Sequence, residues 1–157
     1  MLPDSIALIL PRLAAAMVLG ALIGLNRELK HKPAGLRTHA LVALGAAVLT
    51  LLAGGQTGSG DLAHYDALSR VIQGIITGIG FLGAGVILRS ADGHHVSGLT
   101  TAASIWLAAC LGCACGTGAW AITACAFALI MLILILGGPL ERWALRRFKP
   151  PPDERSL

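Results

Sequence analysis

The side chains best suited to chemistry in this sequence lie at the ends of its apolar segments. They combine arginines, hydroxyls, one acid, an amide and an imidazole: Asn26, Arg27, Glu28, Arg37, Thr38, His39, Arg89, Thr100, Thr101 and Ser104. Arginine and hydroxyl groups bind anions, and the N-terminus of a helix that begins near Thr100 adds a positive field. We expect one polar cluster on the cytoplasmic side, acting either as a site or as the solvated ends of membrane helices. Asn26 and Ser104 favour a site, because they lie inside the apolar boundaries.

A second polar set lies within the third apolar segment. Arg70, Gln73 and Thr77 occur at i, i+3 and i+7, so they share one face of a helix. Polar side chains inside a membrane usually face the interior of a helix bundle and form hydrogen bonds there. The spacing therefore predicts a buried structural network or, alternatively, the polar wall of a cavity.

No pattern in the sequence indicates enzymatic chemistry. Glu28 alone is a poor magnesium site, because such sites use one or two carboxylates together with waters or phosphates, and Asp92 is the only other acid in a neighbouring loop. Cys110, Cys113 and Cys115 have a metal-like spacing but lie in an apolar segment, where cysteine behaves as a small hydrophobe. We predict no bound metal, no cofactor and no catalytic residues.

The composition indicates the kind of frame that holds these residues. The chain of 157 residues is 55% hydrophobic and 13% charged, whereas about a quarter of the residues in soluble domains are charged. The apolar residues occur in five runs: 13–25, 40–53, 71–88, 99–115 and 119–136. Apolar runs of about 18 residues are typical of membrane spans. The sequence predicts an all-α membrane protein, a bundle of about five short, glycine-rich transmembrane helices.

Glycines predict where these helices pack. Gly20 with Gly24, and Gly74 with Gly78, have the GxxxG spacing that lets helix backbones approach closely in lipid. We predict that the first helix packs on the third through these pairs, with contact between two copies of the chain as the alternative. The predicted packing residues are Gly20, Gly24, Gly74, Gly78, Gly80, Gly83 and Gly85. Gly78, Gly80 and Gly83 also have the GxGxxG spacing of a dinucleotide-binding motif, but neither the preceding strand nor the later acidic residue that this motif needs is present.

Charge predicts the orientation of the bundle. The net charge is +4, and basic residues gather in 26–37 and 141–157, whereas 54–69 contains two aspartates and no Lys or Arg. Lys and Arg mark cytoplasmic loops. Five spans then place the N-terminus outside, the C-terminus inside and every basic segment inside. Nucleic-acid binding is disfavoured, because the basic segments adjoin apolar helices and lack aromatic platforms.

Prolines and capping residues predict where the helices begin and end. We expect the first helix to begin near Pro11, with 1–10 either lengthening the span or lying along the membrane. Thr100 is expected to cap the fourth helix, and Gly137-Gly138-Pro139 to end the fifth. Residues 1–138 would form the transmembrane domain, and 139–157 a basic amphipathic turn with a flexible cytoplasmic tail.

Four blocks of the sequence resemble the signature of the MgtC/SapB family. They are 24–28 (GLNRE), 32–38 (KPAGLRT), 78–85 (GIGFLGAG) and 98–104 (GLTTAAS). Their order and spacing match the family from Arg12 to Pro139. The resemblance implies a multi-pass protein of the bacterial inner membrane, linked to growth at low magnesium and to virulence.

Two features depart from the family pattern. Members often have glutamate before the arginine of the first block, where this chain has Asn26, with Glu28 two positions later. Many members also carry a soluble C-terminal domain that resembles ACT regulatory modules. The sequence ends at Leu157, so we expect no ligand sensing through such a domain.

Two functions fit these observations. The resemblance implies a regulatory protein that acts through another membrane protein complex, in magnesium or phosphate homeostasis or in restraint of ATP synthase. The alternative is a small transporter or channel for magnesium or an anion, assembled as a homo-oligomer. An enzyme is the weakest interpretation, since no nucleophile or metal site is visible.

Overall fold

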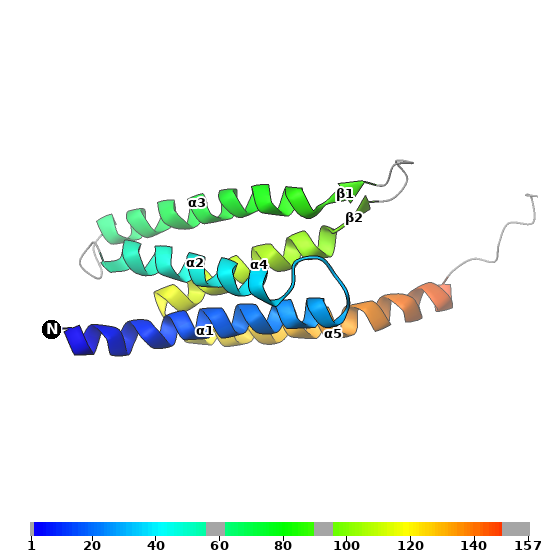
Figure 1. Cartoon of the computed structure of the whole chain (residues 1–157), viewed down its shortest axis with the longest axis horizontal. Helices are drawn as coiled ribbons and strands as arrows, with labels where there is room; N and C mark the ends of the chain where they lie inside the picture. Colours follow the sequence, from blue (N-terminus) through cyan, green and yellow to red (C-terminus); the bar gives the residue numbers. More distant parts are fainter. Residues whose placement is uncertain (1, 56–61, 90–95, 149–157) are drawn as a thin grey trace, which may run out of the picture.

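The apolar runs of the sequence fold into long helices (Figure 1). The computed structural model describes residues 2–55, 62–89 and 96–148. Its helices are α1 (Leu2–Leu29), α2 (Leu36–Gly55), α3 (Leu62–Val86), α4 (Leu99–Thr117) and α5 (Trp120–Phe148). All five are long and apolar enough to cross a membrane. The predicted all-α membrane bundle of about five helices is therefore confirmed.

The helix ends favoured at Pro11 and Pro139 are wrong, whereas the alternative that residues before Pro11 lengthen the first helix agrees with the structure. α1 runs through Pro11 from Leu2, and α5 runs through Pro139 to Phe148. A proline removes one backbone hydrogen bond, whereas ending a helix in lipid leaves several backbone groups unpaired. Continuing the helix through the proline therefore has the lower free energy. Residues 139–148 extend α5 instead of forming a separate turn. The tail from residue 149 onward lies outside the described residues.

A short hairpin, which the sequence did not suggest, joins α3 to α4. β1 (Leu88–Arg89) pairs antiparallel with β2 (Val96–Ser97). The hairpin brings Gly98 so close to α3 that a Cβ there would lie 2.0 Å from the carbonyl oxygen of Val86. Gly98 caps the start of α4 with a φ of 90°, and no side chain among the described residues caps this first turn. The prediction that Thr100 caps α4 is therefore wrong.

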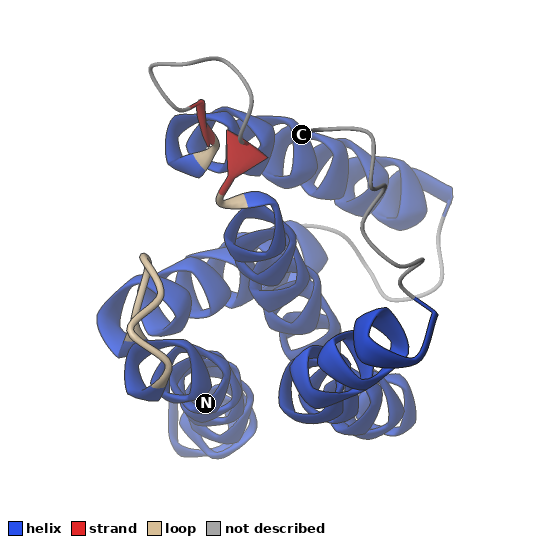
Figure 2. Cartoon of the chain, turned by 90° about the vertical axis from the view of Figure 1, so that its right-hand side faces the viewer, coloured by secondary structure: helices blue, strands red, loops and turns tan. Residues whose placement is uncertain are grey.

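Small residues are prominent in the centre of the bundle, beside a few buried large ones such as Ile23 and Leu111, and many large apolar side chains face outward. α4 packs against all four other helices, and α2 lies against α1, α3 and α4 (Figure 2). The core includes Ala16, Ala43, Ala47, Ala108 and Cys115. By contrast, Ile122 is 67% exposed and Ile133 is 63% exposed on α5. Small residues let helix backbones approach closely, and large apolar side chains on the outside suit contact with lipid.

Two pairs of glycines hold α2 between α1 and α4. A Cβ at Gly20 would lie 2.5 Å from the carbonyl oxygen of His39, and one at Gly24 would lie 2.5 Å from that of Gly35. On the other side, a Cβ at Gly112 would lie 2.2 Å from the carbonyl oxygen of Ala43. The Gly20–Gly24 pair therefore packs on α2, and the prediction that it packs on the third helix is wrong.

Candidate functional site

The helix ends that carry the predicted polar cluster meet at one end of the bundle, on the right in Figure 1. There α1, α3 and α5 end, and α2 and α4 begin. The structure divides the predicted cluster into a buried part, an exposed part and a pocket.

The buried part is a chain of four polar side chains, which we call the buried polar chain: Arg27, Thr101, Ser104 and His39. Each has an exposed fraction of 5% or less. The Arg27 guanidinium donates to Thr101 Oγ1 at 2.5 Å, and Ser104 Oγ lies 3.0 Å from His39 Nε2. Ser104 Oγ also lies 2.8 Å from the backbone carbonyl oxygen of Thr101, which joins the two pairs. The chain links α1 and α2 to the first turns of α4.

The hydrogen bonds of His39 restrict where its protons lie. His39 Nδ1 is 3.0 Å from the carbonyl oxygen of Gly35, which can only accept, so Nδ1 carries a hydrogen. Ser104 has a single hydroxyl hydrogen for two neighbours, His39 Nε2 and the Thr101 carbonyl. It donates to Nε2 when the imidazole is neutral, and to the carbonyl when Nε2 is protonated. The same heavy-atom arrangement thus accommodates both protonation states.

Buried polar atoms without partners remain beside this chain. Among the described residues, Arg27 Nε and Asn26 Oδ1 are buried and have no hydrogen-bond partner. Buried polar atoms are nearly always hydrogen-bonded, so these two atoms need a partner that the described residues do not supply. Asn26 and Arg27 are adjacent at the end of α1.

Arg27 lines a pocket of about 900 Å³ between the end of α1, the start of α4 and α5. We call it the basic pocket. Its polar lining consists of Arg27, Lys30, Lys32, Thr100, Glu141 and Arg142. Its apolar wall comes from 133–135, 137–139 and Leu145 of α5. The Lys30 ammonium donates to the carbonyl oxygen of Leu134, close to Pro139. The predicted residues Arg27 and Thr100 thus face residues of α5 that were not predicted as part of the site.

The exposed part of the cluster supports the turn between α1 and α2. Glu28 Oε2 accepts from the backbone N–H of Leu36 at 3.0 Å and so satisfies a free amide at the start of α2. Glu28, Arg37 and Thr38 line a shallow polar hollow with this turn. Glu28 therefore has a structural role at a helix start. The Arg89 side chain lies outside the described residues, although its backbone belongs to β1.

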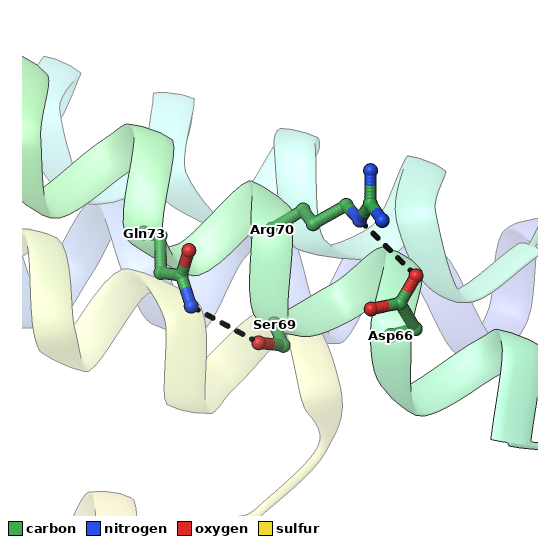
Figure 3. Close-up of polar contacts among 4 residues, drawn as sticks. All are labelled: Asp66, Ser69, Arg70 and Gln73. Carbon is green, nitrogen blue, oxygen red and sulfur yellow. Dashed lines mark hydrogen bonds and ion pairs between the residues drawn. The ribbon is translucent and has the colours of Figure 1, made fainter.

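The polar row of α3 does not face the bundle interior. Arg70 pairs with Asp66 at 3.1 Å, with side-chain exposures of 77% and 65%. Gln73 donates to Ser69 at 3.4 Å, and Thr77 to the backbone carbonyl of Gln73 at 2.8 Å. As Figure 3 shows for the first two contacts, each connects residues of α3 one turn apart. The predictions of a buried network and of a cavity wall are both wrong for the single chain, because α2 and α4 pack on the apolar side of α3.

The glycines of α3 share this outward position. A Cβ at Gly74, Gly78, Gly80 or Gly85 would meet no atom within 4 Å, whereas one at Gly83 would lie 3.6 Å from Ala102. Only Gly83 therefore packs against another helix of this chain. We define the outer face of α3 by the following residues: Arg70, Gln73, Gly74, Thr77, Gly78, Phe81 and Gly85, all of them exposed.

Sequence reasoning missed two groups that hold α4. Gly112 and Gly116 form a GxxxG pair against α2, and this spacing was visible within the cysteine-containing segment. Arg12 donates from Nη1 to the carbonyl oxygen of Gly116 at 3.0 Å, where a cation stabilises the negative end of the helix. Cys113 and Cys115 are buried in apolar clusters, in agreement with their predicted role as small hydrophobes. Within the described residues, no three His, Cys, Asp or Glu side chains lie close enough to hold a metal ion.

Comparison with known proteins gives the family. A profile of the MgtC family matches residues 13–143, which include α2, α3, the β1–β2 hairpin, α4 and most of α1 and α5. The chain belongs to the MgtC family. It is 49% identical over 115 residues to Protein SrpB of Synechococcus elongatus, in a match that covers 69% of this chain and 63% of SrpB. No solved structure matches it significantly.

Two further relatives carry the family name. Over 106 residues, this MgtC-family chain is 50% identical to Protein MgtC of Salmonella typhimurium, which covers 68% of this chain and 42% of that protein. Over 144 residues it is 43% identical to Protein MgtC of Brucella abortus, with coverages of 88% and 57%. The chain thus spans roughly two fifths to three fifths of the lengths of the curated relatives it matches.

Proposed function

We propose that this MgtC-family protein is a regulatory membrane protein that binds another membrane protein through the outer face of α3. The observation that carries the proposal is the composition of that face, which combines polar side chains and glycines within an apolar span. Neither type suits contact with lipid tails. Both are typical of surfaces where membrane helices pack on one another.

The depth of the polar residues supports a protein partner over lipid. The apolar span of α3 is Tyr65–Val86, so Arg70 lies near its first turns and can reach the membrane surface with its long side chain. Gln73 and Thr77 lie further in, and both are exposed. The carboxamide of Gln73 would face hydrocarbon in an isolated chain, and a partner helix would replace that contact with a hydrogen bond.

The glycines supply the space for such a helix. Gly74 and Gly78 border an apolar groove of about 570 Å³ between α2 and α3. A GxxxG pair with nothing packed on it lets a second backbone approach closely. A partner helix lying on this groove would cover the glycines and the polar row at the same time.

Site-specific photocrosslinking tests this proposal. A photoreactive phenylalanine analogue replaces Phe81, which is 82% exposed on the outer face of α3, and a control carries it at Ile122, 67% exposed on α5. In membranes of the native host we expect a discrete crosslink to a membrane protein from position 81. Gly74→Ile with Gly78→Ile should abolish it, and Ala128→Ile on the exposed side of α5 should not. Equal crosslinking from both positions, or persistence in the glycine variant, would contradict the proposal.

The process that this contact controls is proposed from the family resemblance: magnesium or phosphate homeostasis in the bacterial inner membrane, or restraint of ATP synthase. ATP-driven proton pumping in inverted membrane vesicles tests the second process. We expect the unsubstituted chain to reduce pumping and the Gly74→Ile/Gly78→Ile variant to restore it. Unchanged pumping with the unsubstituted chain would remove ATP synthase as the partner.

The alternative, a small magnesium or anion transporter, requires several copies of the chain. Because Arg70, Gln73 and Thr77 are exposed on α3, they can line a polar path only between protomers. Reconstituted liposomes should then show flux that Gln73→Leu and Thr77→Val reduce. Absence of flux at any imposed gradient would eliminate transport and leave the regulatory function.

A further inference from the structure

The basic pocket has an excess of positive charge that the described residues do not balance. It is lined by four cationic side chains, Arg27, Lys30, Lys32 and Arg142, and by one carboxylate, Glu141. Among the residues whose side chains are described, the one ion pair within 4.0 Å joins Arg70 to Asp66 on α3, and neither residue lines this pocket. Arg27 is only 5% exposed and has no carboxylate partner among the described residues.

A buried guanidinium without a counterion is an unfavourable arrangement unless another anion compensates it. Thr101 satisfies one of the donors of Arg27, at 2.5 Å, and Nε has no partner. Thr101 and Thr100 belong to the first turn of α4, whose positive end adds to the field of the cations. The unpartnered Nε is an observation independent of that helix end, and both favour a bound anion.

We propose that the basic pocket binds a phosphate group. Arginine and lysine side chains around a helix start are the groups that bind phosphate oxygens in proteins. The volume, about 900 Å³, exceeds that of an oxyanion alone, and the apolar wall from α5 can hold a hydrophobic group attached to it. The phosphate belongs either to an anionic lipid, whose headgroup lies at the depth of helix ends, or to a soluble phosphate compound.

The two sources present the same chemistry to the cations but differ in what they add. A lipid places its acyl chains along the apolar wall, where Ile133 and Leu145 are 63% and 59% exposed. A soluble phosphate compound uses only the polar lining. The basic pocket is lined by residues of α1, α4, α5 and the turn after α1, and none of α3. Phosphate binding here is therefore independent of partner binding on the outer face of α3.

Two binding measurements on the purified full chain in neutral detergent test the inference. In the first, native mass spectrometry counts retained phosphatidylglycerol against phosphatidylcholine. In the second, the thermal unfolding midpoint is followed with inorganic phosphate against chloride at equal ionic strength. Preferential retention of phosphatidylglycerol that phosphate does not displace identifies a lipid. A midpoint raised by phosphate alone identifies a soluble ligand.

Matched charge variants locate the site. Lys32→Gln with Arg142→Gln removes two exposed cations of the pocket and should weaken binding roughly tenfold or more. The control, Arg37→Gln with Arg146→Gln, makes the same change in net charge at exposed positions outside the pocket lining and should change binding less than about twofold. Both variants leave Arg27 and its hydrogen bond to Thr101 intact. The inference is wrong if neither ligand binds, or if the two variants weaken binding equally.

Discussion

Burying a polar side chain without a partner is unfavourable, and each buried polar residue in the described part of the chain forms at least one hydrogen bond. Thr101 and Thr50 are both 1% exposed, yet their hydroxyls do different things. Thr101 accepts from the Arg27 guanidinium of another helix, whereas Thr50 Oγ1 lies 3.0 Å from the carbonyl oxygen of Ala46 in its own helix. Hydrogen bonds to charged groups contribute more than neutral ones, and they cost more when one partner is left behind.

Thr101→Val should therefore destabilise the bundle more than Thr50→Val, although both replace a hydroxyl by a methyl group. We expect the free energy of unfolding to fall by about 1.5–3 kcal/mol for Thr101→Val and by less than about 1 kcal/mol for Thr50→Val. Unfolding in mixed micelles followed by circular dichroism measures both. Equal losses would show that Thr101 does not stabilise the buried Arg27.

At the scale of helices, the space around each glycine shows which helices pack most closely. A Cβ at Gly112 would lie 2.2 Å from backbone of α2, one at Gly83 would lie 3.6 Å from Ala102, and one at Gly45 would meet nothing within 4 Å. The α2–α4 contact is thus the tightest of the three, and the exposed side of α2 is the loosest. Arg12 strengthens the same arrangement from α1 by its hydrogen bond to the end of α4.

A series of Gly→Ala substitutions should follow these distances. Gly112→Ala should lower the free energy of unfolding by at least about 2 kcal/mol, because α2 and α4 must separate to admit the methyl group. Gly83→Ala should change it little, and Gly45→Ala should be neutral or stabilising by up to about 1 kcal/mol, because alanine favours helix. Thermal unfolding of the three variants in one detergent gives the order. A Gly45→Ala variant as unstable as Gly112→Ala would contradict the packing of α2 on α4.

At the scale of the whole molecule, four of the positively charged side chains gather at one end of the bundle. Arg27, Lys30 and Lys32 from the end of α1 and its following turn line the same pocket as Arg142 of α5. Lys and Arg near the ends of short loops hold those loops on the cytoplasmic side. We therefore expect this end to face the cytoplasm, with the N-terminus outside.

Reporter fusions test that orientation. Alkaline phosphatase, which is active only outside the cytoplasm, should be inactive when joined after Phe148 and active when joined after Gly55, the last residue of α2. A fluorescent protein joined after Phe148 should fluoresce. High phosphatase activity after Phe148 would reverse the predicted orientation.

The helices of this fold could be predicted because the length and hydropathy of a segment identify a membrane helix. Which helix packs against which could not be predicted. Both GxxxG pairs of α1 and α3 were visible, yet only the structure shows that Gly20 and Gly24 pack on α2 and that Gly74 and Gly78 pack on nothing. Spacing within one helix fixes which residues share a face and says nothing of which helix meets that face. The same limit explains the error over Arg70, Gln73 and Thr77.

The sequence predicted part of the candidate site, namely the part that depends only on which helix ends lie together. Ends of adjacent membrane helices must lie close together, so the joint position of Arg27, His39, Thr101 and Ser104 follows from five alternating spans. The contribution of α5 was missed because Pro139 suggested that the helix ends there, whereas it continues and carries Arg142 to the pocket. The Glu28 contact with Leu36 depends on the local turn geometry, with His31 and Ala34 at positive φ, which no sequence spacing encodes.

The position of α4 at the centre of the bundle has a consequence for biosynthesis. The ribosome delivers α1, α2 and α3 before the helix against which all of them pack. Until α4 emerges, Arg27 and His39 lack the hydroxyl groups of Thr101 and Ser104, and a bare guanidinium is costly in hydrocarbon. The growing chain must therefore keep the end of its first helix near the lipid headgroups. α1 and α2 can already pack through Gly20 and Gly24, whereas the hydrogen bonds of Arg27 and His39 form only when the fourth helix has entered.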